Sequence, residues 1–299
     1  MKVYRTTADL PPLRRAKAQA GSLLRGLFPR LSQSVHAAPF DPAWDWRGRL
    51  IRNAHLFDAI RTRDHATLQR YLHHFWATGE SAGFFDRFSH RFEDLFLRHH
   101  LGLVDALDRL APEFARRPPR LVEIGSGDGR VLAYLAGRLP WVAEFHGIDL
   151  NARQIAACRE RHAHQPAFHF HCEDALGWLR RQPEAPTILF ANGGVLEYLR
   201  RSQISTLLTD LLDRGSPAVV AITESLAVDH DLTADRDSYP YGLEIAFSHA
   251  YPAIAAEVGF TPHIVADRFT QPGEENHPNR WLQMIALGPE ISPASLAPR

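Results

Sequence analysis

The stretch LVEIGSGDGR, residues 121–130, constrains the fold of this chain more than any other stretch. It begins with an apolar run of the kind that a buried parallel strand shows. Three glycines then alternate with other residues over 125–129, and glycine permits positive φ and close approach of a ligand to the backbone. Helical spacing of apolar residues resumes at Val131. Strand, glycine turn and helix in this order present backbone N–H groups and a helix N-terminus to a nucleotide-like ligand.

The glycine spacing separates this stretch from the dinucleotide fingerprint. That fingerprint follows G-x-G-x-x-G, whereas Gly125, Gly127 and Gly129 follow G-x-G-x-G. Glu123 stands inside the predicted strand, where its carboxylate can accept hydrogen bonds from the turn or lie near an ammonium group. A nucleotide-dependent oxidoreductase is therefore disfavoured. On this stretch alone, a structural turn in another α/β protein stays open as the alternative.

Composition narrows the class of protein. The chain has 299 residues, enough for one large domain or a domain plus a cap, and its 45% hydrophobic content predicts a globular fold. A formal net charge of zero argues against a main role in gripping nucleic acid, so no nucleic-acid partner is expected. Cys158 and Cys172 offer no disulfide framework, which fits a reducing, cytoplasmic location. No apolar run approaches the roughly 20 residues of a membrane span.

Shifts in composition divide the chain into four predicted segments. Prolines between the last cap helix and the first strand mark the main boundary. The segments are a basic N-terminal arm or lid (1–40), a helical cap (41–118), a sheet domain (119–290) and a disordered tail (291–299).

The helices of the first two segments carry recognisable start and stop signals. We expect Gly21, Gly26 and Pro29 to interrupt any long helix in the first segment, which favours a mobile arm or a lid helix. A basic helix that touches a membrane and a transit peptide are the alternatives. In the cap, Asp41-Pro42 and Asp64 predict two helix starts, and a third helix is expected from Ser81. A fourth runs from Leu103 to Leu110.

An acidic residue ends the second predicted strand about twenty residues after the glycines. This residue, Asp149, is well placed to bind both hydroxyls of a ribose. The alternative is an N-cap for the next helix, but Asn151 can fill that position. The third strand carries His169, His171 and Cys172, yet strand alternation points the cysteine away from the histidines and no second ligand cluster is evident, so no metal is expected.

Four sequence elements occur in order: EIGSGDG, GID, EDA and NGGVLEYL. Together they resemble the motifs of the class I S-adenosylmethionine-dependent methyltransferases, over about residues 119–288. The resemblance implies an α/β fold with a Rossmann-like, seven-stranded, mostly parallel sheet and helices on both faces. It also implies S-adenosylmethionine as cofactor and S-adenosylhomocysteine as product. The residues that the resemblance assigns to cofactor binding are Glu123, Gly125, Ser126, Gly127, Gly129, Asp149, Leu150, Glu173, Asp174, Ala175 and Asn192.

The acceptor side carries fewer signals. The resemblance places Asn192 beside the transferred methyl group, with Glu197 and Tyr198 in the helix that follows, and His230 is a candidate in the long segment after strand five. For Glu197, pairing with an arginine such as Arg200 or Arg201 is the alternative. The aromatic-rich cap favours a small-molecule acceptor, and a homodimer through the cap is possible. RNA or protein methylation, and a non-catalytic interaction module, stay open as alternatives.

Overall fold

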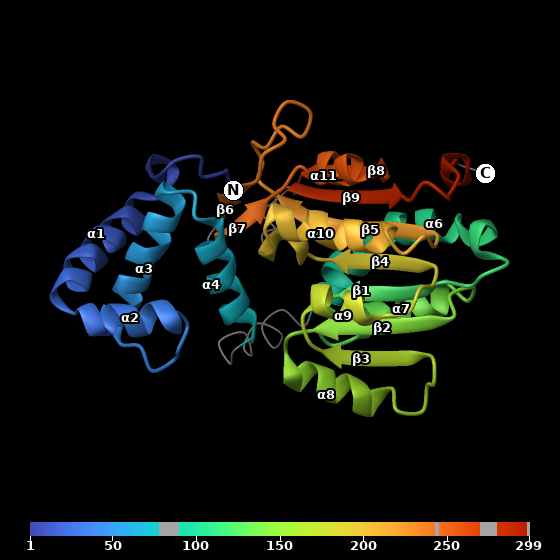
Figure 1. Cartoon of the computed structure of the whole chain (residues 1–299), viewed down its shortest axis with the longest axis horizontal. Coiled ribbons are helices and arrows are strands. Elements are labelled where there is room, and N and C mark those ends of the chain that lie inside the picture. Colours follow the sequence, from blue (N-terminus) through green and yellow to red (C-terminus); the bar gives the residue numbers. More distant parts are fainter. Residues whose placement is uncertain (78–89, 243–244, 270–279, 298–299) are drawn as a thin grey trace.

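The computed structural model describes residues 1–77, 90–242, 245–269 and 280–297. A lobe of helices from the first part of the chain lies beside a sheet domain that has helices on both faces (Figure 1). The beginning of the cap helix expected from Ser81 lies outside the described residues. Within the described ranges, each helix is too short or too polar to cross a membrane.

The described residues of the main sheet form seven strands in the order β3-β2-β1-β4-β5-β9-β8. Strands β1 to β5 pair in parallel, and β9 runs antiparallel to both of its neighbours. This confirms the predicted Rossmann-like, mostly parallel α/β sheet. The strands are β1 (Arg120–Ile124), β2 (Glu144–Asp149), β3 (Phe168–Cys172), β4 (Thr187–Asn192), β5 (Ala218–Leu226), β8 (Thr261–Phe269) and β9 (Arg280–Leu287).

Helices cover both faces of the sheet, and each face has its own apolar core. All five residues of β1 are buried; Val122 and Ile124 belong to one core and Leu121 to the other, as side-chain alternation requires. One face carries α9 (Ala175–Arg181), α10 (Arg201–Leu212) and α11 (Tyr251–Val258). The other carries the π-helix η3 (Phe92–His100), α6 (Leu101–Asp108), the short turn η4 (Ala111–Phe114), α7 (Arg130–Arg138) and α8 (Ala152–Arg161).

The order of the strands fixes where a ligand can bind. β1 lies between β2 and β4. After β1 the chain adds β2 and β3 on one side of it, and after β3 the chain returns across β1 and adds β4 on the other side. Ligands of such sheets bind at the carboxyl ends of the strands, where the strand order reverses. The glycine turn that follows β1 occupies this position.

The helical lobe consists of α1 (Pro12–Leu27), α2 (Pro29–Ala37), α3 (Trp46–Arg61) and α4 (His65–Ala77). The prediction that Gly21 and Gly26 interrupt the first helix was wrong, because α1 continues through both. Gly21 lies where α1 crosses α3: a Cβ atom at this position would come within 1.9 Å of the Leu50 carbonyl oxygen. The glycine therefore serves close helix packing, and only Pro29 separates two helices.

Two predicted ends of elements need correction. The N-cap of α3 is Asp45, which accepts hydrogen bonds from the backbone N–H groups of Arg47 and Gly48, and Asp41 lies in a turn before it. The tail is not entirely irregular, since Pro293–Leu296 forms a short 3-10 helix, η6. By contrast, Asp64 lies immediately before α4 as predicted, and its Oδ1 accepts from the Thr67 N–H at 3.0 Å.

The first residues of the chain attach the lobe to the sheet domain. They precede the short helix η1 (Thr7–Asp9), and Val3 forms an isolated bridge with Tyr241. Tyr241 belongs to a two-stranded sheet of β6 (Tyr239–Tyr241) and β7 (Ala246–Ser248), which lies in the segment after β5. Figure 1 shows α4 between the rest of the lobe and the sheet domain. This arrangement brings α4 to the ligand-binding edge of the sheet.

Candidate functional site

A cavity of about 240 Å³ lies at the carboxyl ends of β1, β2, β3 and β4. Its floor is formed by the turns that follow these strands, and α4 and η3 contribute the opposite wall. Of the residues predicted to bind the cofactor, Gly129 is outside the lining. The other ten line the cavity: Glu123, Gly125, Ser126, Gly127, Asp149, Leu150, Glu173, Asp174, Ala175 and Asn192.

Backbone hydrogen bonds hold the glycine turn against β2. The N–H groups of Gly125 and Ser126 donate to the Ile148 carbonyl at 2.8 and 3.1 Å. Gly125 has a φ of +71°, and a Cβ atom on it would lie 2.7 Å from a Val195 methyl group. The turn therefore requires glycine for its conformation and for the close approach of the segment after β4.

Asp149 joins the end of β2 to this turn. Its Oδ2 accepts from the Gly127 N–H at 2.9 Å and its Oδ1 from the Asn151 N–H at 2.8 Å. Asn151 caps α8 as expected, so Asp149 is not needed as the cap. Burial raises the pKa of the Asp149 carboxyl, which the two backbone donors oppose. Each carboxylate oxygen keeps further lone pairs, so Asp149 can accept hydrogen bonds from ligand hydroxyls in the cavity.

Glu123 is a buried carboxyl group in the cavity wall. The residue is only 3% exposed. Burial raises the pKa of its carboxyl group well above the usual range, and the charges of Asp128 and Asp149 raise it further. Within the described residues, Glu123 Oε2 and Ser126 Oγ are buried and accept or donate no hydrogen bond. A buried carboxylate oxygen without a hydrogen-bond partner is costly. The site therefore favours a ligand that brings a cationic hydrogen-bond donor to Glu123.

The turn after β3 has a structural role that the sequence did not predict. Asp174 is the N-cap of α9, and its Oδ1 accepts from the N–H groups of Leu176 and Gly177 at 3.0 and 3.1 Å. Glu173 forms an ion pair with Arg181 of α9. Both acidic residues still line the cavity. The cap fixes the direction of the Asp174 side chain at the edge of the floor.

Asn192, the last residue of β4, has a partner that sequence reasoning missed. His100, at the end of η3 and only 1% exposed, donates from Nδ1 to Asn192 Oδ1 at 2.6 Å. This bond fixes the amide so that its NH₂ group is left to donate elsewhere. The contact joins residues 92 positions apart, so neither local pattern predicts it.

The wall opposite the floor also comes from distant segments. Gln69, His73 and Trp76 of α4 line the cavity together with Arg91 and residues of η3. Trp76 lies against Tyr198, with ring centroids 5.0 Å apart. Arg91 donates from Nη2 to the Gly193 carbonyl at 2.7 Å, which connects this wall to the segment after β4.

Glu197 and Tyr198 lie in the 3-10 helix η5 (Leu196–Tyr198), but only Tyr198 lines the cavity. The Glu197 carboxylate accepts from the hydroxyls of Ser225, at 2.7 Å, and Tyr241. Arg200, expected as an alternative partner, bonds Gln203. The Glu197 side chain thus lies in a buried polar network with Ser225 and Tyr241.

A second buried carboxyl, Glu224 on β5, holds the start of η5. It accepts from the N–H groups of Val195 and Leu196 at 3.1 Å and of Glu197 at 3.2 Å. Burial and then the charge of Glu197 raise the pKa of Glu224 to about 8. The hydrogen bonds to Glu224 therefore fix the backbone next to Tyr198.

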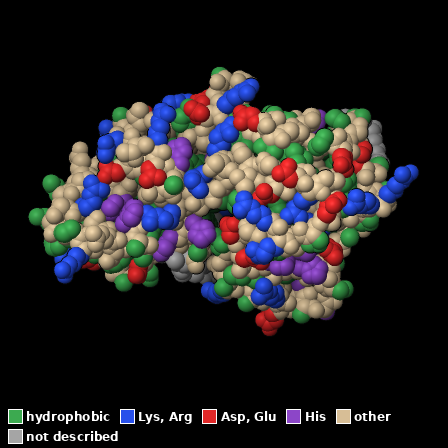
Figure 2. Space-filling model, viewed as in Figure 1, with side chains coloured by type: hydrophobic (Ala, Val, Ile, Leu, Met, Phe, Trp, Pro, Cys, Tyr) green, Lys and Arg blue, Asp and Glu red, His purple; other side chains and the backbone are tan. Residues whose placement is uncertain are grey.

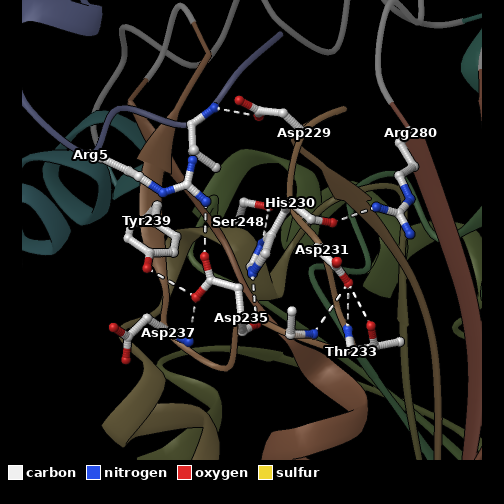
Figure 3. A network of polar contacts seen from close by, with 12 residues as sticks. Arg5, Asp229, His230, Asp231, Thr233, Asp235, Asp237, Tyr239, Ser248 and Arg280 are labelled. Atoms are coloured by element: carbon white, nitrogen blue, oxygen red, sulfur yellow. Dashed lines mark hydrogen bonds and ion pairs between the residues drawn. The ribbon is translucent and has the colours of Figure 1, made fainter.

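His230 lies in a different network, outside the cavity lining (Figure 3). It is fully buried, bonds Ser248 Oγ at 2.9 Å and donates from Nε2 to the Asp235 carbonyl at 3.3 Å. Burial lowers the pKa of this histidine. Arg5 pairs with Asp235 at 2.9 Å in the same network. The structure brings His230 together with the N-terminal arm, and not with Asn192.

Comparisons with known proteins agree with this geometry. Residues 121–215 match the family model described as a methyltransferase domain. No curated protein sequence matches the chain. The matched range includes the glycine turn, Asp149, Asp174, Asn192 and η5.

Solved structures resemble the chain in fold. The plantazolicin methyltransferase BamL, in complex with a triazolic desmethylPZN analog and SAH, has a TM-score of 0.50 at 14% identity, covering 76% of this chain and 97% of that one. Magnesium protoporphyrin IX methyltransferase (ChlM) from Synechocystis PCC 6803 with bound SAM has a TM-score of 0.46 at 13% identity, covering 74% and 97%. WbdD, described as a bifunctional kinase-methyltransferase, has 0.44 at 14%; 62% of this chain matches, which spans 39% of the WbdD chain.

Proposed function

We propose that this chain, a class I S-adenosylmethionine-dependent methyltransferase by its fold and its methyltransferase domain, methylates a small-molecule acceptor in the cavity between the strand ends and α4. The observation that carries the proposal is the juxtaposition of a polar floor, where Glu123 and Asp149 face the cavity, with an aromatic wall from the helical lobe. Cofactor and acceptor would meet between them.

The floor suits S-adenosylmethionine. Glu123 Oε2 and the Ser126 hydroxyl, which lack hydrogen-bond partners within the described residues, would hold the ammonium group of the methionine moiety. The Asp149 carboxylate would accept hydrogen bonds from the ribose hydroxyls. Asp174 and the Ala175 N–H, which also line the cavity, would bind the adenine. An ammonium beside Glu123 would also offset the cost of its burial.

The bound cofactor supplies an electrophilic methyl group on a sulfonium. The chain's own contribution is then positioning and exclusion of water. Asn192, whose oxygen is held by His100, would direct its NH₂ toward the acceptor, and Tyr198 and Trp76 would form the apolar side of its site. Glu197 and Glu224 would not touch the acceptor but would fix the backbone of η5, which carries Tyr198.

A small acceptor fits this cavity better than a polymer. The volume of about 240 Å³ and the wall of α4 and η3 limit what can reach Asn192. Because the formal net charge of the chain is zero, a nucleic acid would gain little from the surface as a whole. An RNA or protein acceptor would have to insert a single base or side chain past α4.

The first experiment is calorimetric titration of the purified chain with S-adenosylmethionine and S-adenosylhomocysteine, with NAD as the control. We expect both sulfur ligands to bind and NAD not to bind. Absence of binding by either sulfur ligand would favour a non-catalytic interaction module. A Glu123→Gln variant should bind more weakly, because a neutral amide loses the attraction for the ammonium group.

The acceptor class is tested with a cofactor that carries a labelled methyl group. The chain is incubated with separate small-molecule, RNA and protein fractions. Label in the small-molecule fraction supports the proposal. Label confined to RNA or protein would replace it with polymer methylation while leaving the cofactor assignment intact.

A further inference from the structure

Three histidines and one glutamate gather at the sheet edge formed by β2 and β3. Figure 2 shows histidine side chains grouped on the surface over these strands. The parallel pairing of the strands places His146 of β2 opposite His169 of β3. Glu144 and His171 lie two residues from these histidines on their own strands, so strand alternation puts all four side chains on one face. This is the face that Trp178 of α9 also covers.

The distances within this group suit a metal ion. His146 Nε2 lies 3.2 Å from Glu144 Oε2. One ligand atom each from Glu144, His146 and His169 lie within 4.8 Å of one another. Bonds of about 2.0–2.2 Å in a tetrahedral zinc site put neighbouring ligand atoms roughly 3.3 Å apart. Because Glu144 is exposed and His169 is half-buried, rotations of these side chains can bring the group to that spacing.

His171 supplies the support that metal-binding histidines need. Its Nε2 lies 3.3 Å from His146 Nδ1. A ligating histidine usually donates its second ring N–H to an acceptor, which fixes the tautomer that binds the metal. If His146 donates from Nδ1 to His171, its Nε2 lone pair is left on the side of Glu144. In this arrangement His146 Nε2 can bind a metal ion, and the hydrogen bond from Nδ1 orients the ring.

We propose that Glu144, His146 and His169 bind one divalent transition-metal ion of the zinc type, with His171 as a positioning residue. Two imidazoles and a carboxylate are ligands that Zn²⁺ accepts, and the fourth position is left for water. Glu144 begins β2 whereas Asp149, which lines the cavity, ends it. The ion would therefore connect the edge strand β3 to β2 and take no part in methyl transfer.

The test is titration of the chelator-treated full chain with Zn²⁺, and with Co²⁺ as a spectroscopic probe. All proteins carry Cys172→Ser, because this exposed thiol follows His171 and could bind metal itself. We compare His169→Gln and Glu144→Gln with a matched control, His263→Gln, on β8 at the opposite edge of the sheet. Circular dichroism checks that each variant is folded.

We expect one ion per chain in the parent and the control, and at least tenfold weaker binding in both ligand variants. His171→Gln should weaken binding by about 10- to 100-fold, as is typical of such supporting residues. Because a ligand of the native state raises stability, Zn²⁺ should raise the Tm of the parent and control but not of His169→Gln. Equal affinity across the series, absence of a single bound ion, or loss of binding in His263→Gln would overturn the proposal.

Discussion

The floor and the far wall of the cavity are built in different ways. The floor consists of turns that directly follow β1, β2, β3 and β4, and its side chains are held mainly by backbone groups, as Asp149 is by Gly127 and Asn151. The far wall is assembled from α4 and η3, and its contacts join side chains far apart in sequence, as His100 and Asn192 do.

This difference indicates which part of the site can change. A floor fixed by strand ends and backbone hydrogen bonds keeps one geometry for one cofactor. A wall made of side chains on separate helices can exchange residues without disturbing the sheet. We therefore expect substitutions in the floor to affect cofactor binding and substitutions in the wall to affect the acceptor alone.

The largest effect should come from Asp149→Ala. The variant loses two backbone hydrogen bonds that shape the turn and the proposed ribose contacts. Hydrogen bonds to charged groups contribute about 1.5–3 kcal/mol each, so we expect S-adenosylhomocysteine to bind about 10- to 100-fold more weakly. Calorimetry measures the change. The control is Asp105→Ala, which breaks only an exposed ion pair with Arg138; unchanged affinity in Asp149→Ala would place the cofactor elsewhere.

Acid should destabilise the protein in part through a buried histidine beside the cavity. The fully buried His249 donates from Nε2 to the carbonyl of Leu199, a cavity residue, and burial lowers its pKa to about 3. Its pKa in the unfolded chain is about 6.5, so the unfolded state binds the extra proton between these values. The contribution of His249 should therefore lower the stability by about 1.4 kcal/mol per pH unit below pH 6.5 and have no effect above it.

Melting curves from pH 7 to pH 5 test this prediction. In His249→Asn, which keeps a donor and an acceptor but does not titrate, Tm should fall less steeply with decreasing pH. His164→Gln, at an exposed position, should behave like the parent. If all three proteins show the same slope, His249 does not govern the acid sensitivity.

Gly125→Ala tests the close approach of the glycine turn to Val195 in the segment after β4. The added methyl would meet Val195 at 2.7 Å on a backbone with φ of +71°. A left-handed conformation costs a non-glycine residue about 1–2 kcal/mol, so we expect about tenfold weaker cofactor binding. Adding Val195→Ala should recover the steric part of the loss and leave the conformational part. No recovery in the double variant would show that the contact with Val195 is unimportant.

The sequence was sufficient for the sheet and the floor because both depend on local patterns. Glu123, the glycines and Asp149 follow from strand, turn and helix signals within thirty residues of chain. The other cofactor-side residues were named from the resemblance to the methyltransferase motifs, which requires no knowledge of which strands pair. The capping role of Asp174 and the ion pair of Glu173 with Arg181 required the structure.

The sequence was insufficient wherever a contact depended on packing between distant elements. The crossing of α1 and α3 explains Gly21, and no pattern within α1 contains that information. His100 reaches Asn192 through the π-helix η3. The position of His146 beside the histidines of β3 follows only from the pairing of β2 and β3 in register.

The smallest effect should follow Trp76→Ala, and it is the sharpest test of the comparison. Trp76 packs on Tyr198 in the wall, away from the backbone groups of the floor. Loss of about 1 kcal/mol of apolar contact should lower kcat/KM for the acceptor on the order of fivefold. The Kd for S-adenosylhomocysteine should stay the same. Trp46→Ala is the matched control, because this tryptophan is 63% exposed on α3 and does not line the cavity. If Trp76→Ala weakens cofactor binding as much as it lowers turnover, the wall is part of the cofactor site, and the separation of the two sides is wrong.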